Sequence, residues 1–242
     1  DGNTAVIGGP LDNKSNGAFW VFTRSGGVWT QQGSKLVPAD GSPGAEFGNS
    51  VAISGDGNTA LIGGWKDNNG VGAVWVFTRN GSSWIQQAAK LTPSDLIGNA
   101  EFGSAVALSA DGNLALVGGQ RDNGFGAAWI FVRNGAMWNQ LGSKLLPGDA
   151  AGQPFFGSAV ALSADGTTAL IGGLLDSPTT TTAVGATWVF IRNGVLWTQQ
   201  GAKLVGNNYL SPPNQGAAVA LAATQKIAPS HHVAHPRSAN AT

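Results

Sequence analysis

The sequence predicts an all-β propeller of four four-stranded antiparallel blades, and three observations favour this fold class. Asp-Gly or Asp-Gly-like turn motifs recur with a period of 54–55 residues, and tryptophans recur in pairs nine residues apart. The 37 glycines and nine tryptophans follow no triplet period, which indicates many tight turns between aromatic-rich strands. A fixed period of this length is typical of a propeller or solenoid. The repeated positions are the turn residues Asp1, Asp56, Asp111 and Asp165, and the tryptophan pairs 20/29, 75/84, 129/138 and 188/197.

Each repeat contains four segments with strand character. In the second repeat these are SVAIS (50–54), TALIGG (59–64), GAVWVFTR (72–79) and SWIQQAAKL (83–91). The first segment is rich in small residues, and the last contains Gln and Lys. This order is expected for a propeller blade, whose first strand lies near the crowded central axis and whose last strand is exposed to solvent at the rim. Short Asp-Gly and Asn-Gly motifs suit hairpin turns, and no helix is expected anywhere.

The first and last repeats are each incomplete. The chain begins in a second strand, and GAAVAL (216–221) aligns with the first strand GSAVAL (103–108). We therefore expect the C-terminal strand 215–223 to pair with the N-terminal strand 3–9 and close the ring. Closure between molecules, which would give a larger ring or a filament, is the alternative. The expected domains are a propeller over 1–225 and a flexible tail over 226–242.

The Phe-Gly pairs at 47–48, 102–103 and 156–157 are each followed by an apolar strand and then by Gly-Gly. In this respect residues 1–223 resemble the FG-GAP repeats of integrin α-chain propellers and their bacterial relatives. The resemblance implies a secreted or cell-surface protein with a noncatalytic binding or adhesion role. It often implies calcium in a long Asp-rich loop between the first two strands. Here that loop is only SGDGN (54–58), without further carboxylates, so we expect no cofactor.

The composition argues against several partner classes. Charged residues make up 11% of the chain, the formal net charge is zero, and the basic residues are not clustered. Neither nucleic acid nor direct membrane insertion is therefore expected. The absence of cysteine excludes disulfides, thiolate metal sites and cysteine nucleophiles.

The acidic residues argue against an enzyme. All thirteen occupy repeated positions, whereas an acid/base pair needs two carboxylates in different environments. The three histidines lie in the tail, and no Gly-x-Ser-x-Gly motif occurs. Besides the turn aspartates, the acids are Asp12, Asp67, Asp122 and Asp176 in the second-to-third loops, Asp40, Asp95 and Asp149 in the interblade links, and Glu46 and Glu101 before Phe-Gly.

One face should collect the second-to-third loops and the interblade links, and it would be acidic and rich in amides. Such a face could bind a polyhydroxylated ligand or a divalent cation, although Asp and Asn also simply cap turns. Trp65 has no equivalent in the other repeats and could stack on a sugar, whereas the paired tryptophans are expected between blades. The candidate ligand-binding residues are Asp12, Asn13, Trp65, Asp67, Asn68, Asp122, Asn123 and Asp176.

Three functions remain open from the sequence. The first is a noncatalytic interaction or adhesion module that binds a protein or glycan at the cell surface. The second is a structural protein that assembles into a homo-oligomer or filament through its terminal strands. The third is a carbohydrate-binding lectin.

Overall fold

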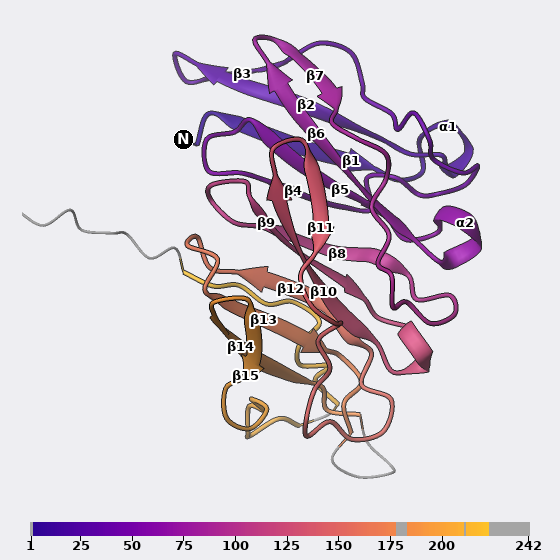
Figure 1. Cartoon of the computed structure of the whole chain (residues 1–242), viewed down its shortest axis with the longest axis vertical. Coiled ribbons are helices and arrows are strands. Elements are labelled where there is room, and N and C mark those ends of the chain that lie inside the picture. Colours follow the sequence, from indigo (N-terminus) through magenta and orange to yellow (C-terminus); the bar gives the residue numbers. More distant parts are fainter. Residues whose placement is uncertain (1, 178–182, 211, 223–242) are drawn as a thin grey trace, which may run out of the picture.

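The computed structural model describes residues 2–177, 183–210 and 212–222, and strands dominate this part of the chain (Figure 1). Blade 1 consists of β1 (Thr4–Gly9), β2 (Ala18–Ser25) and β3 (Val28–Gln31). Blade 2 consists of β4 (Ser50–Ile53), β5 (Thr59–Gly64), β6 (Ala73–Asn80) and β7 (Ser83–Gln86). Blade 3 consists of β8 (Phe102–Leu108), β9 (Leu114–Gly119), β10 (Ala127–Asn134) and β11 (Met137–Gln140). Blade 4 consists of β12 (Phe156–Leu162), β13 (Thr168–Gly173), β14 (Ala186–Asn193) and β15 (Leu196–Gln199).

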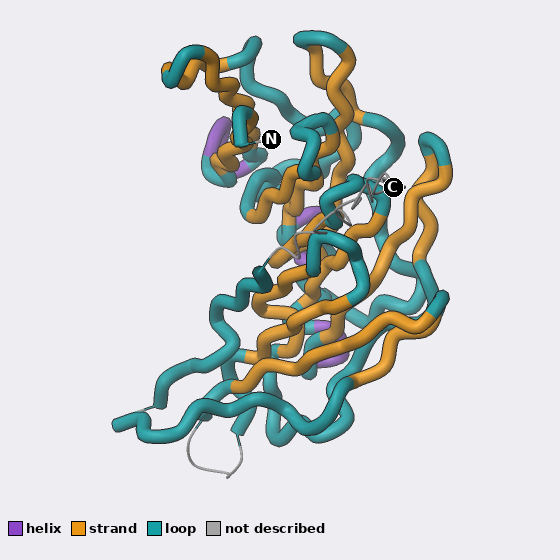
Figure 2. The backbone as a smooth tube through the Cα atoms, turned by 90° about the vertical axis from the view of Figure 1, so that its left-hand side faces the viewer, coloured by secondary structure: helices purple, strands orange, loops and turns teal. Residues whose placement is uncertain are grey.

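Within each blade the strands pair antiparallel in chain order, so the predicted all-β blade architecture is confirmed. The first hairpin of blade 2 closes where Ser54 N donates to Thr59 O at 2.9 Å. Its turn places Gly57 at a φ of 70°, a left-handed conformation that glycine adopts without strain. Among the first strands, β4 contacts β8 and β8 contacts β12, and the blades follow one another along the molecule (Figures 1 and 2).

The hydrophobic core lies between blades rather than within one of them. Three clusters of buried side chains join blades 1 and 2, blades 2 and 3, and blades 3 and 4. In the first cluster Phe47 meets Trp75 edge-on, with ring centroids 5.2 Å apart. The same pair recurs as Phe102 with Trp129 and as Phe156 with Trp188, both at 5.3 Å. The Phe of each Phe-Gly motif therefore holds the tryptophan of its own blade within an interblade core.

Five of the six repeated tryptophans of blades 2 to 4 are buried against the preceding blade, and Trp197 is partly buried there. Trp75, Trp129 and Trp188 are fully buried, and Trp84 and Trp138 are each 8% exposed. Trp29 of blade 1, in contrast, is 44% exposed. The interblade packing predicted for these residues thus holds in blades 2 to 4, whereas no blade lies in front of blade 1 in the described part of the chain.

The second-to-third loops contain short helical turns, which the sequence analysis did not expect. These are α1 (Asp12–Ser15), α2 (Asp67–Gly70) and the 3₁₀ turn η1 (Asp122–Gly124). In each of them the backbone carbonyl of the aspartate accepts a hydrogen bond from the backbone N–H of a glycine four or five residues later. In α2, for example, Gly72 N donates to Asp67 O at 2.9 Å. Asn68 and Asn69 adopt positive φ in α2, a conformation that asparagine tolerates better than most residues.

The predicted closure of the ring is not confirmed. Among the described residues, β1 pairs only with β2, so blade 1 is three-stranded there, and residues 216–222 form no strand. Blade 1 and blade 4 lie at opposite ends of the molecule (Figure 1). Residue 223, the last of the expected C-terminal strand, and the expected tail 226–242 lie outside the described residues.

One indole N–H in this core lacks the partner that its equivalents have. Trp84 Nε1 donates to Gln32 Oε1 at 3.0 Å, and Trp138 Nε1 donates to Gln87 Oε1 at 3.2 Å, each across a blade boundary. The matching position in blade 3 is Leu141, and Trp197 Nε1 is buried without a hydrogen bond among the described residues. An unsatisfied buried donor costs about 1–3 kcal/mol.

We expect Leu141→Gln to raise the free energy of unfolding by about 1 kcal/mol, because it restores a hydrogen bond that the two preceding interfaces contain. Urea denaturation followed by tryptophan fluorescence measures the change. The matched control is Gln87→Leu, which should destabilise the protein by orphaning Trp138 Nε1. A loss of stability in Leu141→Gln would mean that the apolar contacts of Leu141 outweigh the missing hydrogen bond.

Candidate functional site

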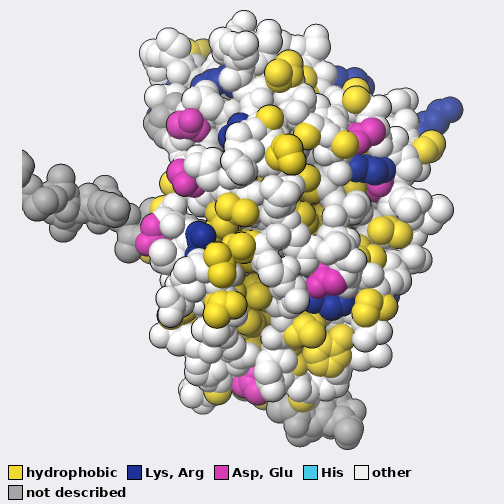
Figure 3. Space-filling model, viewed as in Figure 1, with side chains coloured by type: hydrophobic (Ala, Val, Ile, Leu, Met, Phe, Trp, Pro, Cys, Tyr) yellow, Lys and Arg dark blue, Asp and Glu magenta, His cyan; other side chains and the backbone are white. Residues whose placement is uncertain are grey.

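The second-to-third loops and the interblade links lie together at one edge of the blades, which we call the loop face (right-hand side of Figure 1). The links place their carboxylates and amides there because each link runs from the outer strand of one blade back to the first strand of the next. Acidic side chains on the side seen in Figure 3 are dispersed, and several adjoin Lys or Arg. The loop face is therefore polar without a continuous acidic patch on this side.

The four predicted loop aspartates form ion pairs with lysines of the same chain. Asp122 is 1% exposed, receives Lys144 Nζ at 2.5 Å, and accepts the Ile97 backbone N–H at 2.7 Å. Asp67 and Asp176 are equally buried and make the same pair of contacts, with Lys90 and Lys203. Asp12 pairs with Lys35 but remains partly exposed. This geometry gives the aspartates a role in fixing loop to link, and whether a ligand reaches them stays a prediction.

The link aspartates anchor the buried tryptophans. Asp95 accepts hydrogen bonds from Trp129 Nε1 at 2.8 Å, from Gln140 Nε2 at 2.9 Å and from the Lys144 backbone N–H at 2.8 Å. Burial alone would raise the pKa of Asp95, but these hydrogen bonds outweigh it and lower the pKa below its ordinary value. Asp40 and Asp149 hold Trp75 and Trp188 in the same way, and their pKa values are lowered by the same balance.

The turn aspartates serve the first hairpins. Asp56 Oδ1 accepts from Ser54 Oγ at 2.5 Å and from the Asn58 backbone N–H at 2.9 Å. Asp111 and Asp165 close equivalent turns. Hydrogen bonds lower the pKa of Asp165, above all the one from Ser163. Across the described residues, no group of three or more Asp, Glu or His side chains is arranged to hold a metal ion.

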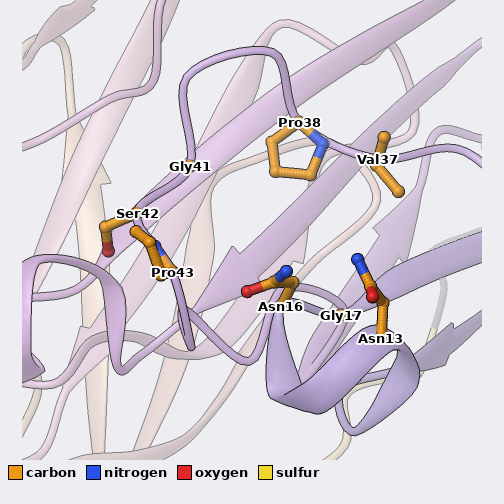
Figure 4. Close-up of a pocket in the computed structure, with 8 residues that line it drawn as sticks. All are labelled: Asn13, Asn16, Gly17, Val37, Pro38, Gly41, Ser42 and Pro43. Carbon is orange, nitrogen blue, oxygen red and sulfur yellow. The ribbon is translucent and has the colours of Figure 1, made fainter.

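The predicted amides are exposed at the tips of the loops. Asn13, Asn68 and Asn123 each adopt positive φ, at 48°, 50° and 50°. Asn13 and Asn16 line a cavity of about 230 Å³ with residues of the first link, and their side chains rise from α1 toward Val37 and Pro38 (Figure 4). This cavity is small and holds no charged side chain in its lining.

Trp65 lies in a larger cavity on the loop face, of about 560 Å³. Its indole Nε1 donates to Glu46 Oε2 at 2.8 Å, and Lys66 Nζ lies 2.5 Å from Glu46 Oε1 and 4.7 Å from the centroid of the Trp65 ring. The half-buried indole is therefore fixed in orientation by a hydrogen bond to a carboxylate and by a cation–π contact with an ammonium group. The lining consists of Pro43, Gly44, Trp65, Lys66, Asn69, Gly70, Asn99, Glu101 and Arg121.

The opposite wall of this cavity belongs to blade 3. Glu101 receives Arg121 Nε at 2.8 Å and Gln120 Nε2 at 2.7 Å, and the Arg121 guanidinium lies 5.2 Å from the Phe155 ring centroid. Both glutamates adopt positive φ, 51° at Glu46 and 55° at Glu101, which is unusual for this residue. The cavity thus combines one aromatic ring, two amides and two cations held by carboxylates.

The sequence analysis found Trp65 but missed the charged residues around it. The signal lies in the comparison of repeats: the two copies with Glu before Phe-Gly have Lys66 or Arg121 before the loop aspartate. The copy with Phe155 at the glutamate position has Leu175 at the basic position. This joint change predicts the two ion pairs that the structure contains.

The FG-GAP repeat model matches residues 29–77, 84–131 and 138–190, which together make up more than half of the chain. The chain belongs to the FG-GAP repeat family. Each matched FG-GAP unit runs from the outer strand of one blade to the third strand of the next, so the unit includes the interblade link and Phe-Gly. No curated protein matches the chain.

Several solved structures resemble this chain at low sequence identity, and one of the three described here has a TM-score above 0.5. A candidate 6-phosphogluconolactonase from Bacteroides fragilis is 14% identical with a TM-score of 0.52, over 84% of this chain and 55% of that one. TolB from Acinetobacter baumannii is 13% identical with a TM-score of 0.43, over 84% and 42%. The periplasmic gluconolactonase of Pseudomonas aeruginosa is 13% identical with a TM-score of 0.43, over 86% and 69%. The chain thus spans about half the length of the first two, and these identities bear on the fold alone.

No helix in the described part of this FG-GAP protein has the length and apolar character required to cross a membrane.

Proposed function

We propose that this FG-GAP chain is a noncatalytic interaction module, secreted or displayed at the cell surface, that binds a glycan through its loop face. The observation that carries the proposal is the Trp65 cavity, which is the larger of the two described cavities on that face. The secreted location and the adhesion role rest on the family, whose resemblance to integrin-type propellers implies both.

The chemistry of the cavity favours a polyhydroxylated ligand. A sugar ring offers an apolar face for the Trp65 indole and hydroxyl groups for hydrogen bonds. Asn69 and Asn99 supply both donors and acceptors, while Glu101 accepts and Arg121 donates. Because Lys66 and Arg121 are each paired with a glutamate, the cavity has little net charge and favours a neutral glycan over a strongly anionic one.

The noncatalytic part of the proposal rests on how the carboxylates are used. The loop aspartates form ion pairs with lysines, and the link aspartates accept hydrogen bonds from tryptophans. The two glutamates form ion pairs with Lys66 and Arg121. Each set is repeated in at least two blades, and a general acid paired with a general base would require two carboxylates in contrasting environments. Binding is therefore the activity that these side chains favour.

The test is binding of the purified chain to a panel of neutral and acidic glycans, with Trp65→Ala as the variant. We expect Trp65→Ala to weaken binding about tenfold, the equivalent of roughly 1.4 kcal/mol from a lost stacking contact. Tyr209→Ala is the matched control, since Tyr209 is an exposed aromatic outside the cavity lining.

Equal binding by Trp65→Ala and the unmodified chain would place the ligand elsewhere on the molecule. Failure to bind any glycan would overturn the glycan proposal, and cleavage of a bound glycan would overturn the noncatalytic one.

A further inference from the structure

Two cavities on the loop face share a wall. Pro43 of the first interblade link lines the smaller cavity, of about 230 Å³, and also lines the Trp65 cavity, of about 560 Å³. A hydrogen bond joins the two linings as well, because Asn16 Oδ1 of the smaller cavity accepts the backbone N–H of Gly44 of the larger one at 2.9 Å. The exposed Pro43 ring therefore forms the boundary between two adjoining cavities.

The smaller cavity lies where the first repeat departs from the second. Asn16 has the position of Val71, since the backbone carbonyl of each accepts the N–H of the next Phe-Gly phenylalanine. Gly41 has the position of Leu96 in the second link, where the leucine packs against the core between blades 2 and 3. An amide and an open space thus replace two apolar side chains. Trp65, in the adjoining cavity, departs from the repeat too.

The lining of the smaller cavity is uncharged and combines apolar surface with hydrogen-bond donors. Val37 and Pro38 supply the apolar surface. The amide nitrogens of Asn13 and Asn16 point toward that surface (Figure 4). For Asn16 the hydrogen bond from Gly44 fixes this orientation, because it engages Oδ1 and leaves Nδ2 on the cavity side. Amide donors opposite an apolar wall suit the hydroxyl groups and the apolar face of a sugar.

Asn13 occupies a position that is exposed even where another blade precedes it. Asn68 and Asn123 have the same position in blades 2 and 3, each of which follows another blade, and both side chains are exposed. The other residues of the smaller cavity belong to the loop of blade 1 and to the link between blades 1 and 2. The cavity is therefore a feature of this loop and this link.

We propose that the two cavities are subsites for one linear, neutral oligosaccharide, in which one sugar stacks on Trp65 and the chain continues over Pro43 into the smaller cavity. This inference rests on the proposed function of the Trp65 cavity and specifies its ligand as a chain of sugars. At about 230 Å³ the smaller cavity is below the roughly 300–1,000 Å³ of an independent ligand site, which favours a subsite. The uncharged lining favours a neutral sugar there, as the paired charges do in the Trp65 cavity.

The dependence of affinity on chain length tests this proposal with the unmodified protein. The probes are linear oligosaccharides of one to six sugar units from the cellulose, chitin, xylan and starch series, and calorimetry measures their binding. We expect the affinity to rise about tenfold or more from the single sugar to the longer chains, because the second subsite adds contacts to a ligand that is already bound.

Two outcomes of this titration separate the proposals. Longer chains that bind no more tightly than the single sugar would overturn the second subsite and leave the glycan site at Trp65 intact. Absence of binding at every length would overturn the proposed function, and the subsite with it.

Asn13→Gly removes an amide from the smaller cavity without touching the Trp65 cavity. Asn13 has a φ of 48°, which glycine adopts without strain, so the variant should fold. We expect it to bind the longer chains about fivefold more weakly than the unmodified protein, through the loss of one hydrogen bond, and to bind the single sugar equally well.

Asn68→Gly is the matched control, because Asn68 is exposed, has a φ of 50° and lines neither cavity. It should bind every chain length as the unmodified protein does. Equal affinities of Asn13→Gly and Asn68→Gly for the longer chains would overturn the subsite. A loss that Asn13→Gly shows for the single sugar as well would also overturn it, since the change would then act on the Trp65 cavity.

Discussion

Asp122→Ala is expected to lower the free energy of unfolding by about 3–5 kcal/mol, because it removes one partner of a buried ion pair. Asp122 is 1% exposed, and Lys144, which it holds at 2.5 Å, is 13% exposed. The substitution leaves the lysine ammonium without its carboxylate in a largely buried site. It also leaves the backbone N–H of Ile97 without its acceptor. Thermal or urea denaturation monitored by circular dichroism measures the loss.

The chain supplies a matched control for this prediction. Asp12 and Lys35 form the same pair in blade 1, with side chains that are 25% and 44% exposed. Solvent screens this pair, so Asp12→Ala should cost only about 0.2–1 kcal/mol. Equal losses in the two variants would show that burial does not set the strength of the pair, and would contradict the structural role assigned to Asp122.

The repeat pattern made most of the fold predictable. The strand segments of blade 2 occur within a residue or two of their expected positions, because alternation and turn motifs act locally. The burial of Trp75 and Trp129 was predictable as well, since a blade needs large flat side chains between sheets. The one-turn helices were not, because they depend on left-handed asparagines, and no periodic pattern marks them.

The candidate site was harder to predict than the fold. A loop aspartate such as Asp67 is the same residue type whether it binds a ligand or a lysine of its own blade. Only the burial of Asp67 and its contact with Lys90, which lies 23 positions away in the chain, separate these roles. Trp65 could be found because it breaks the repeat. A residue that departs from a repeat is thus a better guide to binding than one that conforms to it.

The ring closure expected from the sequence depended on geometry that the repeat does not contain. The match between GAAVAL (216–221) and GSAVAL (103–108) predicts that the last segment can act as a first strand. It does not say whether that strand reaches β1 of the same chain. That depends on the angle between successive blades, which is set by many small contacts at each interface.

Gly118→Ala is expected to destabilise the protein by about 3 kcal/mol or more, because the close approach of blades 3 and 4 leaves no room for a methyl group. A Cβ at this position would lie 2.0 Å from Gly157 O, a backbone atom that can move only if the two blades separate. The contact recurs at Gly8, Gly63 and Gly172, with distances of 1.9, 2.1 and 1.9 Å to the glycine carbonyl of the next Phe-Gly or equivalent motif. The first glycine of each Gly-Gly pair therefore sets the spacing between blades.

Gly148→Ala is the control for this prediction, because it adds the same methyl group where there is space for it. The nearest atom to a Cβ at Gly148 is Gln199 Oε1 at 3.4 Å, and Gly148 does not adopt a left-handed conformation. Its stability should stay within about 0.5 kcal/mol of the unmodified chain. If Gly118→Ala proved as stable as Gly148→Ala, the blades could move apart at little cost. The spacing between them would then be set by the aromatic pairs, such as Phe156 with Trp188, rather than by the glycines.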